Sequence, residues 1–317
     1  MWTFKNNIAI ATHCCFLLQS LTSRGINIIV LPLKTQQNRV FYRMISGKPG
    51  PLQREHRSKK RMHTASDCDA NRNPVVKQVS VEGNIAVGKS TFTRLLGKTF
   101  TQWEVVPEPI SKWQDVTSNT KLEDITSLTA CGGNLLQLLY DDTVRWAFTF
   151  QTCSLLSRIK AHLEPSSEKM LKAKDPVKIF ERSVYSDRYV FAKAVSEMHF
   201  INEVEWAIYQ DWHNFLMQEL GTRLCLDGII YLRASPEVCL ERSHRRDRLE
   251  EKGLSVDYLA ELHRQHENWL IHRTADIHFE HIQNIPVLVL DVNKEFEDIA
   301  EEEEKLVNQV KNFIKTL

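Results

Sequence analysis

Metal-binding and redox motifs are missing from this 317-residue sequence. None of its seven cysteines forms a C-x-x-C pair, and histidine, cysteine and acidic residues do not cluster at the spacing of a zinc site. His263 and His266 share a predicted helix face, but the sequence offers no third ligand near them. We interpret both as helix-surface residues, so the sequence gives no support for a zinc or dithiol centre.

Long hydrophobic runs are also missing. Two largely apolar stretches, at 8–18 and 26–33, are too short to span a bilayer as a helix. We therefore expect no membrane partner. The sequence also contains no internal repeat, so a solenoid or propeller is not expected.

Acidic residues are missing from the first 54 positions. Residues 1–66 contain 11 Lys and Arg but only one acid, Glu55, which leaves 30 basic and 39 acidic residues in the remainder. A basic leader with serine, threonine and amphipathic stretches is typical of a mitochondrial transit peptide and predicts a matrix location. A secretory signal, or a cytosolic tail if translation starts at Met44 or Met62, are the alternatives. We expect residues 1–75 to be a leader and disordered linker, and 76–317 to fold.

The acidic body argues against nucleic acid as a partner, because such binding depends on neutralising phosphates with basic side chains. A different ligand is indicated by residues 79–91. Gly83, Gly88, Lys89 and Ser90 have the spacing G-x-x-x-x-G-K-[ST], in which backbone N–H groups surround phosphates, the lysine reaches the β- and γ-phosphates and the serine binds Mg²⁺. The sequence therefore predicts a site for ATP or another nucleoside triphosphate.

Short apolar runs alternate with longer helical patterns after residue 76, which favours a parallel sheet covered by helices on both faces. We predict strands at 77–82, 103–106, 177–180, 228–232 and 287–290. Helices are predicted near 89–99, 134–164, 184–195, 203–220, 236–247, 255–273 and 296–316.

Charged residues follow the predicted strands, where ligands bind in sheets of this kind. Glu108, held between two prolines, is a candidate base for a hydroxyl that attacks the γ-phosphate. Glu181 is a candidate Mg²⁺ ligand, and Arg182 can neutralise the transferring phosphoryl group. A helical lid over the donor is suggested by four arginines, Arg242, Arg245, Arg246 and Arg248.

One predicted helix carries a polar line through an apolar surface. Gln151, Ser154 and Arg158 share a face and suit recognition of a nucleobase edge, and Asp187 can orient Arg158 through a bidentate pair. Stacking walls can come from Trp113, Tyr140, Phe150 and Phe191, although aromatic residues at such positions more often belong to a core.

With these residues in place, the sequence from residue 79 to 317 resembles the deoxyribonucleoside kinase family. The matching segments are VEGNIA (81–86), VPEP (106–109), FTFQT (148–152), ERSVYSDRY (181–189), YQDWH (209–213) and LDVN (290–293). The resemblance implies a P-loop kinase fold with a five-stranded parallel sheet and a helical lid. It also implies Mg²⁺-dependent phosphoryl transfer from ATP or another NTP to the 5′-hydroxyl of a deoxyribonucleoside. Family members are dimers through helices near 134–164 and 203–220, so a homodimer is implied.

The resemblance also implies roles for individual residues. Glu108 would be the base, Arg182 the transition-state cation, and Ser90 with Glu181 the Mg²⁺ site. The donor would be held by the phosphate loop, the lid and a segment beside the donor base, that is by Gly83, Asn84, Ile85, Ala86, Val87, Gly88, Lys89, Ser90, Thr91, Arg242, Arg246, Arg248, Glu295 and Phe296. Sugar and base of the acceptor would be bound by Tyr140, Glu251, Gln151, Ser154, Arg158 and Asp187, with Trp113 and Phe191 stacking on the base.

The preferred base depends mainly on Arg158 and Asp187, which can serve guanine, adenine or cytosine. Ser154 stands where the cytidine-preferring relative has alanine, and a polar group there is compatible with purines. Within the family, the resemblance is greatest to the mitochondrial, purine-specific members, which implies deoxyguanosine first and deoxyadenosine second. A deoxycytidine kinase of broad specificity is the near alternative, and a P-loop ATPase or switch module is the distant one.

Overall fold

The computed structural model describes residues 29–34, 40–45, 76–116 and 133–317. The chain divides into two compact units, Met1–Lys60 and Arg61–Leu317. In the first unit, β1 (Ile29–Lys34) pairs antiparallel with β2 (Val40–Ile45), within residues 1–75, which we predicted to be a leader and disordered linker. The other residues of the predicted leader lie outside the described residues, so the transit peptide stays a prediction.

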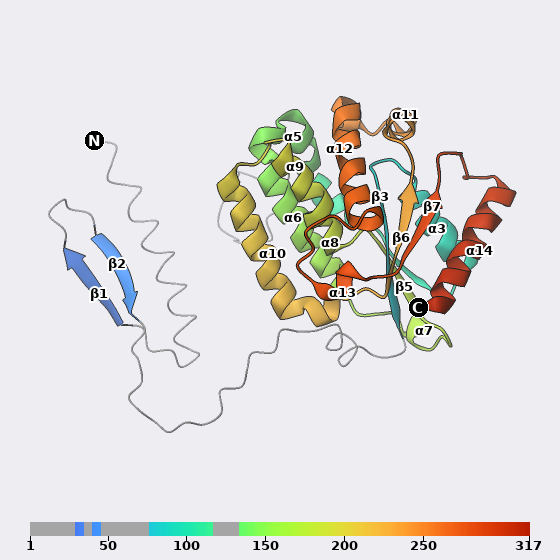
Figure 1. The fold of residues 1–317 in the computed structure, drawn as a ribbon, viewed down its shortest axis with the longest axis horizontal. Coiled ribbons are helices and arrows are strands. Elements are labelled where there is room, and N and C mark those ends of the chain that lie inside the picture. Colours follow the sequence, from blue (N-terminus) through green and yellow to red (C-terminus); the bar gives the residue numbers. More distant parts are fainter. Residues whose placement is uncertain (1–28, 35–39, 46–75, 117–132) are drawn as a thin grey trace, which may run out of the picture. The chain divides into compact units, whose positions relative to one another are not determined.

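The second unit is built on a five-stranded parallel sheet, as predicted (Figure 1). Its strands are β3 (Lys77–Gly83), β4 (Glu104–Val106), β5 (Val177–Glu181), β6 (Gly228–Arg233) and β7 (Val287–Asp291). They lie in the order β4-β5-β3-β6-β7, which places β3 at the centre. Because all strands are parallel, their carboxyl ends meet at one edge, where the loops after β3, β4 and β5 come together.

Successive side chains of each strand point to opposite faces of the sheet, so the strands contribute to two separate hydrophobic cores. Ile229 and Tyr231 of β6 belong to a cluster with residues of the long helices, whereas Ile230 and Leu232 pack with α3 and α14 on the other face. Strands with both faces buried are typical of parallel sheets in α/β proteins. The segments that we interpreted as strands are continuous apolar runs because both of their faces are buried.

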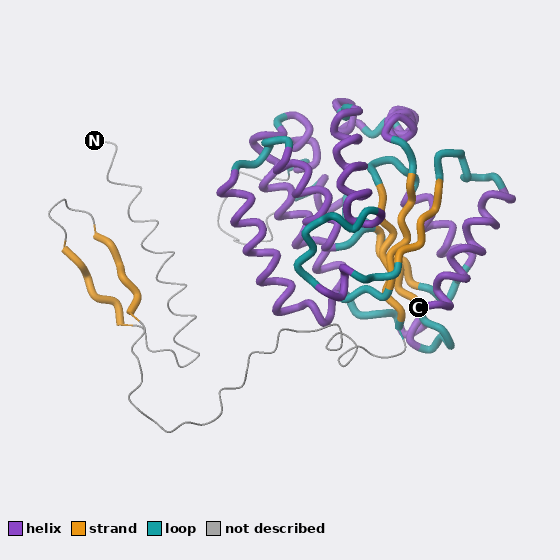
Figure 2. Tube along the Cα trace, viewed as in Figure 1, coloured by secondary structure: helices purple, strands orange, loops and turns teal. Residues whose placement is uncertain are grey.

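Helices cover both faces of the sheet (Figure 2). Figure 1 shows α3 (Lys89–Thr99) and α14 (Ala300–Thr316) on one side, and α6 (Thr143–Leu163), α8 (Val184–Ser186) and α10 (Glu203–Leu224) on the other. The remaining helices near the site are α4 (Ser111–Gln114), α5 (Leu135–Asp141), α9 (Lys193–Glu197), α11 (Pro236–Arg246) and α12 (Val256–His266). Two short ones are α7 (Glu168–Leu171) and α13 (Glu280–Gln283).

Three predicted helices are interrupted in the structure. The predicted helix 134–164 is two helices, because Asp142 ends α5 and caps α6 by accepting a hydrogen bond from the Arg145 N–H at 3.1 Å. The stretches 184–195 and 255–273 continue into π-helical turns, η1 (Asp187–Ala192) and η3 (Glu267–Ile271). A 3₁₀ helix, η2 (Leu249–Gly253), follows α11. Within the described residues, every helix is too short or too polar to cross a bilayer.

Candidate active site

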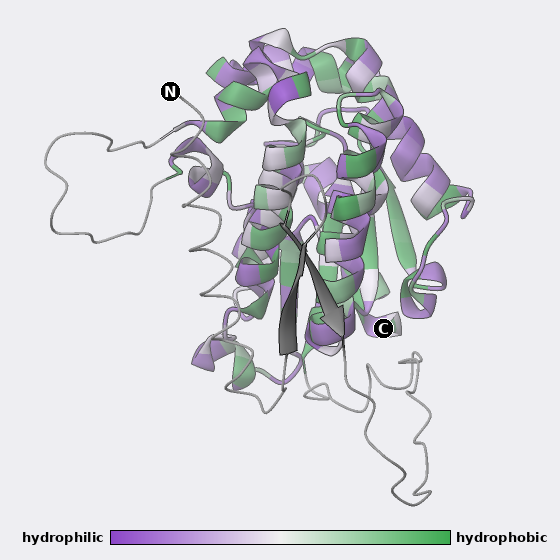
Figure 3. Cartoon of the chain, turned by 90° about the vertical axis from the view of Figure 1, so that its left-hand side faces the viewer, coloured by the Kyte–Doolittle hydropathy of each residue, from purple (hydrophilic) through white to green (hydrophobic). Residues whose placement is uncertain are grey.

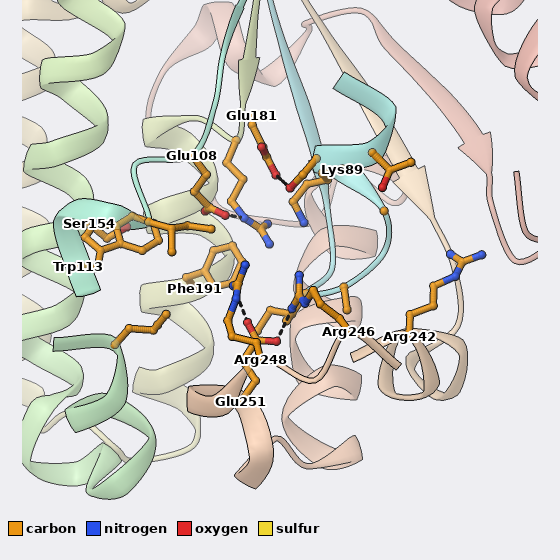
Figure 4. A pocket seen from close by; sticks show the side chains of 18 of the residues that line it. Lys89, Glu108, Trp113, Ser154, Glu181, Phe191, Arg242, Arg246, Arg248 and Glu251 are labelled. Carbon is orange, nitrogen blue, oxygen red and sulfur yellow. Dashed lines mark hydrogen bonds and ion pairs between the residues drawn. The ribbon is translucent and has the colours of Figure 1, made fainter. Parts of the chain in front are cut away.

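A cavity of about 460 Å³ lies beyond the carboxyl ends of the strands. Figure 4 shows its side chains converging from the phosphate loop, the segment after β4, the helix α6 and the lid. Most of the predicted site residues line it, namely Ile85, Ala86, Gly88, Lys89, Ser90, Thr91, Glu108, Trp113, Tyr140, Gln151, Ser154, Arg158, Glu181, Arg182, Asp187, Phe191, Arg242, Arg246, Arg248, Glu251, Glu295 and Phe296. Residues separated by two hundred positions thus meet around one space.

The loop between β3 and α3 has the backbone that a phosphate cradle requires. Gly83 has φ +144° and Gly88 has φ +109°, a region that side chains disfavour. A Cβ on Gly83 would lie 2.5 Å from the Leu232 carbonyl oxygen, so the loop also needs glycine for close packing. The Gly83, Asn84 and Val87 side-chain positions face protein rather than the cavity.

Lys89 and Ser90 begin α3 at the end of this loop. The Lys89 ammonium donates to the carbonyl oxygens of Gly83 at 3.2 Å and Asn84 at 2.6 Å. Burial, and then repulsion from Arg182, lowers the pKa of Lys89 to about 7. The side chain of Lys89 is therefore fixed in position, but nearby negative charge does not offset the cost of burying its ammonium. An anionic polyphosphate would favour the protonated, charged form of the lysine.

Ser90 and Glu181 form a pair of oxygen donors beside the loop. The Ser90 hydroxyl donates to Glu181 Oε1 at 2.6 Å (Figure 4). A hydroxyl and a carboxylate next to a phosphate site match the ligands of Mg²⁺, which takes few protein oxygens and completes its shell with water and phosphate. In the described residues, groups of three or more His, Cys, Asp or Glu side chains suited to a metal are absent. The donor set therefore fits Mg²⁺ bound together with a nucleotide rather than a metal held by protein alone.

Glu108 lies between two arginines. Its Oε1 accepts a hydrogen bond from Arg158 Nη2 at 3.0 Å and forms an ion pair with Arg182 Nε, also at 3.0 Å. Burial alone would raise the pKa of this carboxyl, but the Arg182 and Arg158 charges lower it to about 2. Glu108 is therefore an ionised carboxylate with only 14% of its side chain exposed, directed into the cavity.

Arg182 lies between the phosphate loop and Glu108 and contacts both. Its backbone is in the left-handed region at φ 65°, and its N–H donates to the Val81 carbonyl at 3.0 Å. The guanidinium donates to the Gly83 carbonyl at 2.7 Å and lies 4.4 Å from the Phe191 ring centre. A non-glycine residue at positive φ is uncommon, and such backbones concentrate at functional sites.

Arg158 and Asp187 form the predicted pair at the far end of the cavity. Arg158 Nε donates to Asp187 Oδ2 at 2.8 Å, and Ser154 donates to Asp187 Oδ1 at 3.1 Å. Burial opposes the charge of Arg158, but Asp187 and then Glu108 raise its pKa, so the guanidinium stays charged. Gln151 lines the same wall, and its buried amide oxygen has no protein partner among the described residues. A buried acceptor of this kind indicates a ligand that donates a hydrogen bond.

Two aromatic side chains close the cavity around these polar groups. Trp113 is 4% exposed, packs edge-on against Phe150 and donates from its indole N–H to Ser157 at 2.9 Å. Phe191 lies across the cavity from it (Figure 4). Both rings line the cavity, and aromatic rings at such positions suit stacking on a planar base.

The lid arginines take two different positions. Arg246 and Arg248 both bind the Glu251 carboxylate, Arg248 at 2.7 Å (Figure 4). Arg242 lies apart and donates to the carbonyl oxygens of Val87 at 3.1 Å and Lys294 at 3.0 Å.

The other predicted residues around the lid are also in contact with it or with the loop. Glu295 pairs with Arg245, and Phe296 packs over Gly88. Tyr140 lies near Glu251; its pKa is raised by burial and then by that carboxylate, so it is a neutral hydroxyl.

Several lining residues were not predicted. They are Arg94, Ile110, Leu136, Leu139, Tyr258 and Glu297. Tyr258 stands at helical spacing with Leu259 and Leu262, a pattern that indicates core packing, and it does pack against core residues. Sequence spacing gave no signal that its ring also reaches the cavity.

The sequence of this chain is similar to those of known proteins. A family model described as Deoxynucleoside kinase matches residues 79–315. Mitochondrial deoxyguanosine kinase of Xenopus laevis is 52% identical over 250 residues, covering 79% of this chain and 94% of the relative. Deoxycytidine kinase 2 of Gallus gallus is 49% identical over 251 residues, covering 79% and 95%. Deoxycytidine kinase of Homo sapiens is 49% identical over 243 residues, covering 76% and 92%.

The chain belongs to the deoxynucleoside kinase family. The predicted fold and the predicted phosphoryl transfer from a nucleotide to a nucleoside are confirmed at this level. The distant alternative, a P-loop ATPase or switch module, is not supported.

Proposed function

We propose that this chain transfers a phosphoryl group from ATP, or another NTP, to the 5′-hydroxyl of purine deoxyribonucleosides, chiefly deoxyguanosine and also deoxyadenosine. The observation that supports the purine preference is the Ser154 hydroxyl, which bonds to Asp187 in the polar wall that it forms with Gln151 and Arg158. Arg158 is charged and fixed by Asp187, so its remaining N–H groups can donate to a purine acceptor. The unpartnered Gln151 oxygen can accept from a base N–H or amino group.

Glu108 and Arg182 act on the reacting atoms in this proposal. Glu108 orients the 5′-hydroxyl and takes its proton as the new O–P bond forms, while the bond from the γ-phosphorus to the β–γ bridging oxygen breaks and the nucleoside diphosphate leaves. With a pKa of about 2 it is a weak base, but phosphoryl transfer depends chiefly on positioning and charge stabilisation. Arg182 lies between Glu108 and the phosphate loop, where it neutralises charge on the transferring group.

Ser90 and Glu181 would hold Mg²⁺, which would neutralise charge on the donor phosphates when bound. Lys89, the loop amides, Arg246 and Arg248 would bind those phosphates. The donor base would lie beside Glu295 and Phe296. Arg242 would stabilise the loop through its bond to the Val87 carbonyl rather than bind phosphate in the position seen here.

A broad-specificity deoxycytidine kinase is the second candidate. It is favoured by the deoxycytidine kinases that are 49% identical to this chain, nearly as similar as the deoxyguanosine kinase. The two candidates are separated by measuring kcat/KM of the purified protein for deoxyguanosine, deoxyadenosine, deoxycytidine and thymidine with Mg-ATP. A purine preference supports the proposal, and a higher kcat/KM for deoxycytidine overturns it. Unchanged turnover in Glu108→Gln would overturn the assigned base.

We also propose a homodimer in the mitochondrial matrix. The dimer is supported by an exposed apolar stripe on α10, formed by Val204, Ile208, Trp212 and Phe215, of which Val204 is 69% and Phe215 60% exposed. Figure 3 views the protein from this side, and its helices carry hydrophobic residues among hydrophilic ones. The location is supported by the acid-free leader and by the mitochondrial relative.

A further inference from the structure

Two adjacent glutamates on η2 face different parts of the site. Glu251 binds the lid arginines Arg246 and Arg248 and accepts a hydrogen bond from Ser243 at 3.2 Å. Glu250, the residue before it, points toward α4 and α5 instead. Both glutamates belong to the same short 3₁₀ helix, so a shift of η2 as a whole would move both carboxylates.

Glu250 is bonded to the last residue of α4 and to the residue that caps α5, two helices that line the cavity. Its Oε1 accepts a hydrogen bond from Gln114 Nε2 at 2.8 Å and another from Asn134 Nδ2 at 2.8 Å. Gln114 is the last residue of α4 and follows Trp113. Asn134 caps α5, since its side-chain oxygen also accepts from the Gln137 N–H at 2.9 Å. The Glu250 carboxylate therefore fixes the ends of α4 and α5 to one point.

Those two helices form much of the acceptor side of the cavity. Trp113 comes from α4, and Leu136, Leu139 and Tyr140 come from α5. Glu250 itself is absent from the cavity lining and is 7% exposed. The hydrogen bond from Asn134 is the main cause that lowers the pKa of Glu250, so the carboxylate is ionised at neutral pH. Hydrogen bonds to a charged acceptor are the stronger kind, which suits a positioning role.

We propose that Glu250 is a positioning residue that couples α4 and α5, on the acceptor side of the cavity, to the lid. A nucleoside that orders α4 and α5 orders η2 through Glu250, and Glu251 on η2 positions the two lid arginines for the donor. By linkage, a bound donor must strengthen nucleoside binding by the same factor. This inference rests on the proposed function and adds a residue that touches neither substrate.

The first test separates nucleoside binding from turnover. Glu250→Ala removes both hydrogen bonds and is expected to raise the nucleoside KM about tenfold, as the loss of a charge-assisted bond does, with kcat changed less than about threefold. Gln114→Ala is expected to raise KM less, and the double variant no more than Glu250→Ala alone, because both changes remove the same contact. Additive effects of the two changes would overturn the proposal. Glu168→Ala, at an exposed side chain of α7, is the matched control.

The second test measures the coupling directly. The nucleoside Kd is determined by calorimetry with and without a non-hydrolysable ATP analogue in the wild-type, Glu250→Gln and Glu250→Ala chains. We expect the analogue to tighten nucleoside binding in the wild type, less in Glu250→Gln, which keeps an acceptor oxygen, and hardly at all in Glu250→Ala. Absence of coupling in the wild type, or full coupling in Glu250→Ala, would overturn the inference.

These outcomes are distinct from failure of the proposed function, which would appear as a wild-type chain that phosphorylates no deoxynucleoside. Thermal unfolding of each variant checks folding. If Glu250→Ala does not fold, Glu250→Gln and Gln114→Ala decide the proposal. Wild-type KM and full coupling in both would then overturn it.

Discussion

The Arg182 guanidinium donates a 2.7 Å hydrogen bond to the backbone carbonyl of Gly83. This bond ties the end of β5 to the first residue of the phosphate loop. The same side chain contacts Glu108, so one cation touches both the loop and the carboxylate expected to meet the acceptor hydroxyl. Its position between the phosphate loop and Glu108 is the one that the proposed transition-state cation would require.

We expect Arg182→Lys to lower kcat by about 100-fold or more, because an ammonium cannot contact Gly83 and Glu108 at once as the planar guanidinium does. Initial rates at saturating deoxyguanosine and Mg-ATP measure the effect. Arg223→Lys, at an exposed position near the end of α10, serves as the control and should leave kcat unchanged. A Lys variant with more than half the wild-type kcat would exclude Arg182 from the transition state.

Ser154 provides a test of base choice. Its hydroxyl donates to Asp187, and alanine would free that carboxylate oxygen and enlarge the cavity that Ser154 lines. We expect Ser154→Ala to shift the ratio of kcat/KM for deoxyguanosine over deoxycytidine about fivefold to tenfold toward deoxycytidine, the cost of one buried hydrogen bond. The ratio is measured in competition assays.

The control for this change is Thr152→Val on the same helix. The Thr152 hydroxyl bonds to the Phe148 carbonyl and does not line the cavity. A ratio that moves equally in both variants would assign the effect to the helix rather than to Ser154.

Much of the site was predictable because its geometry follows from strand order. Ser90 and Glu181 are 91 positions apart, yet both were candidate Mg²⁺ ligands, because the phosphate loop and Glu181 follow predicted strands whose carboxyl ends lie at the same edge. Their assignment to one metal site came from the family resemblance. The loop was predictable for a different reason, since its glycines and Lys89 are specified by local spacing alone. Apolar runs located the strands because both faces of the sheet are buried.

Side-chain direction outside the strands was not predictable. Helical spacing suggested that several of the four lid arginines can converge on one polyphosphate, but it did not indicate that Arg242 turns to the Val87 carbonyl. The predicted helix 134–164 breaks at Asp142 because the Asp142 side chain caps α6 instead of continuing α5. The helical apolar pattern continues across Asp142, so the sequence did not indicate the break. The contacts of Glu250 could not be predicted from the sequence either, because its partners belong to two helices that are distant from it in sequence.

The depressed pKa of Lys89 predicts a pH dependence of donor binding. With a pKa of about 7 the free chain holds this lysine mostly neutral at pH 8. A bound triphosphate favours the ammonium and raises that pKa, so binding at pH 8 takes up a proton, and affinity falls as pH rises from 7 to 9. Calorimetry in buffers of different ionisation enthalpy measures the uptake, which we expect to approach one proton.

Two variants control for other groups that titrate in this range. Lys98→Met, at an exposed position on α3, should keep the uptake, and Lys89→Met should abolish it. If donor binding at pH 8 takes up no proton in the wild type, Lys89 is already charged in the free chain and the assigned linkage is wrong.

The apolar stripe on α10 predicts the oligomeric state. Trp212 is 43% and Phe215 60% exposed, more than a large apolar side chain usually is unless it is covered by a partner. Phe215→Glu would place a charge in that interface, which a dimer cannot bury without a partner of opposite sign. We expect the wild type to sediment as a dimer and Phe215→Glu as a monomer at micromolar concentration. Asn312→Glu on α14, across the sheet from α10 (Figure 1), should remain dimeric. A monomeric wild type, or a Phe215→Glu chain that still dimerises, would remove α10 as the interface.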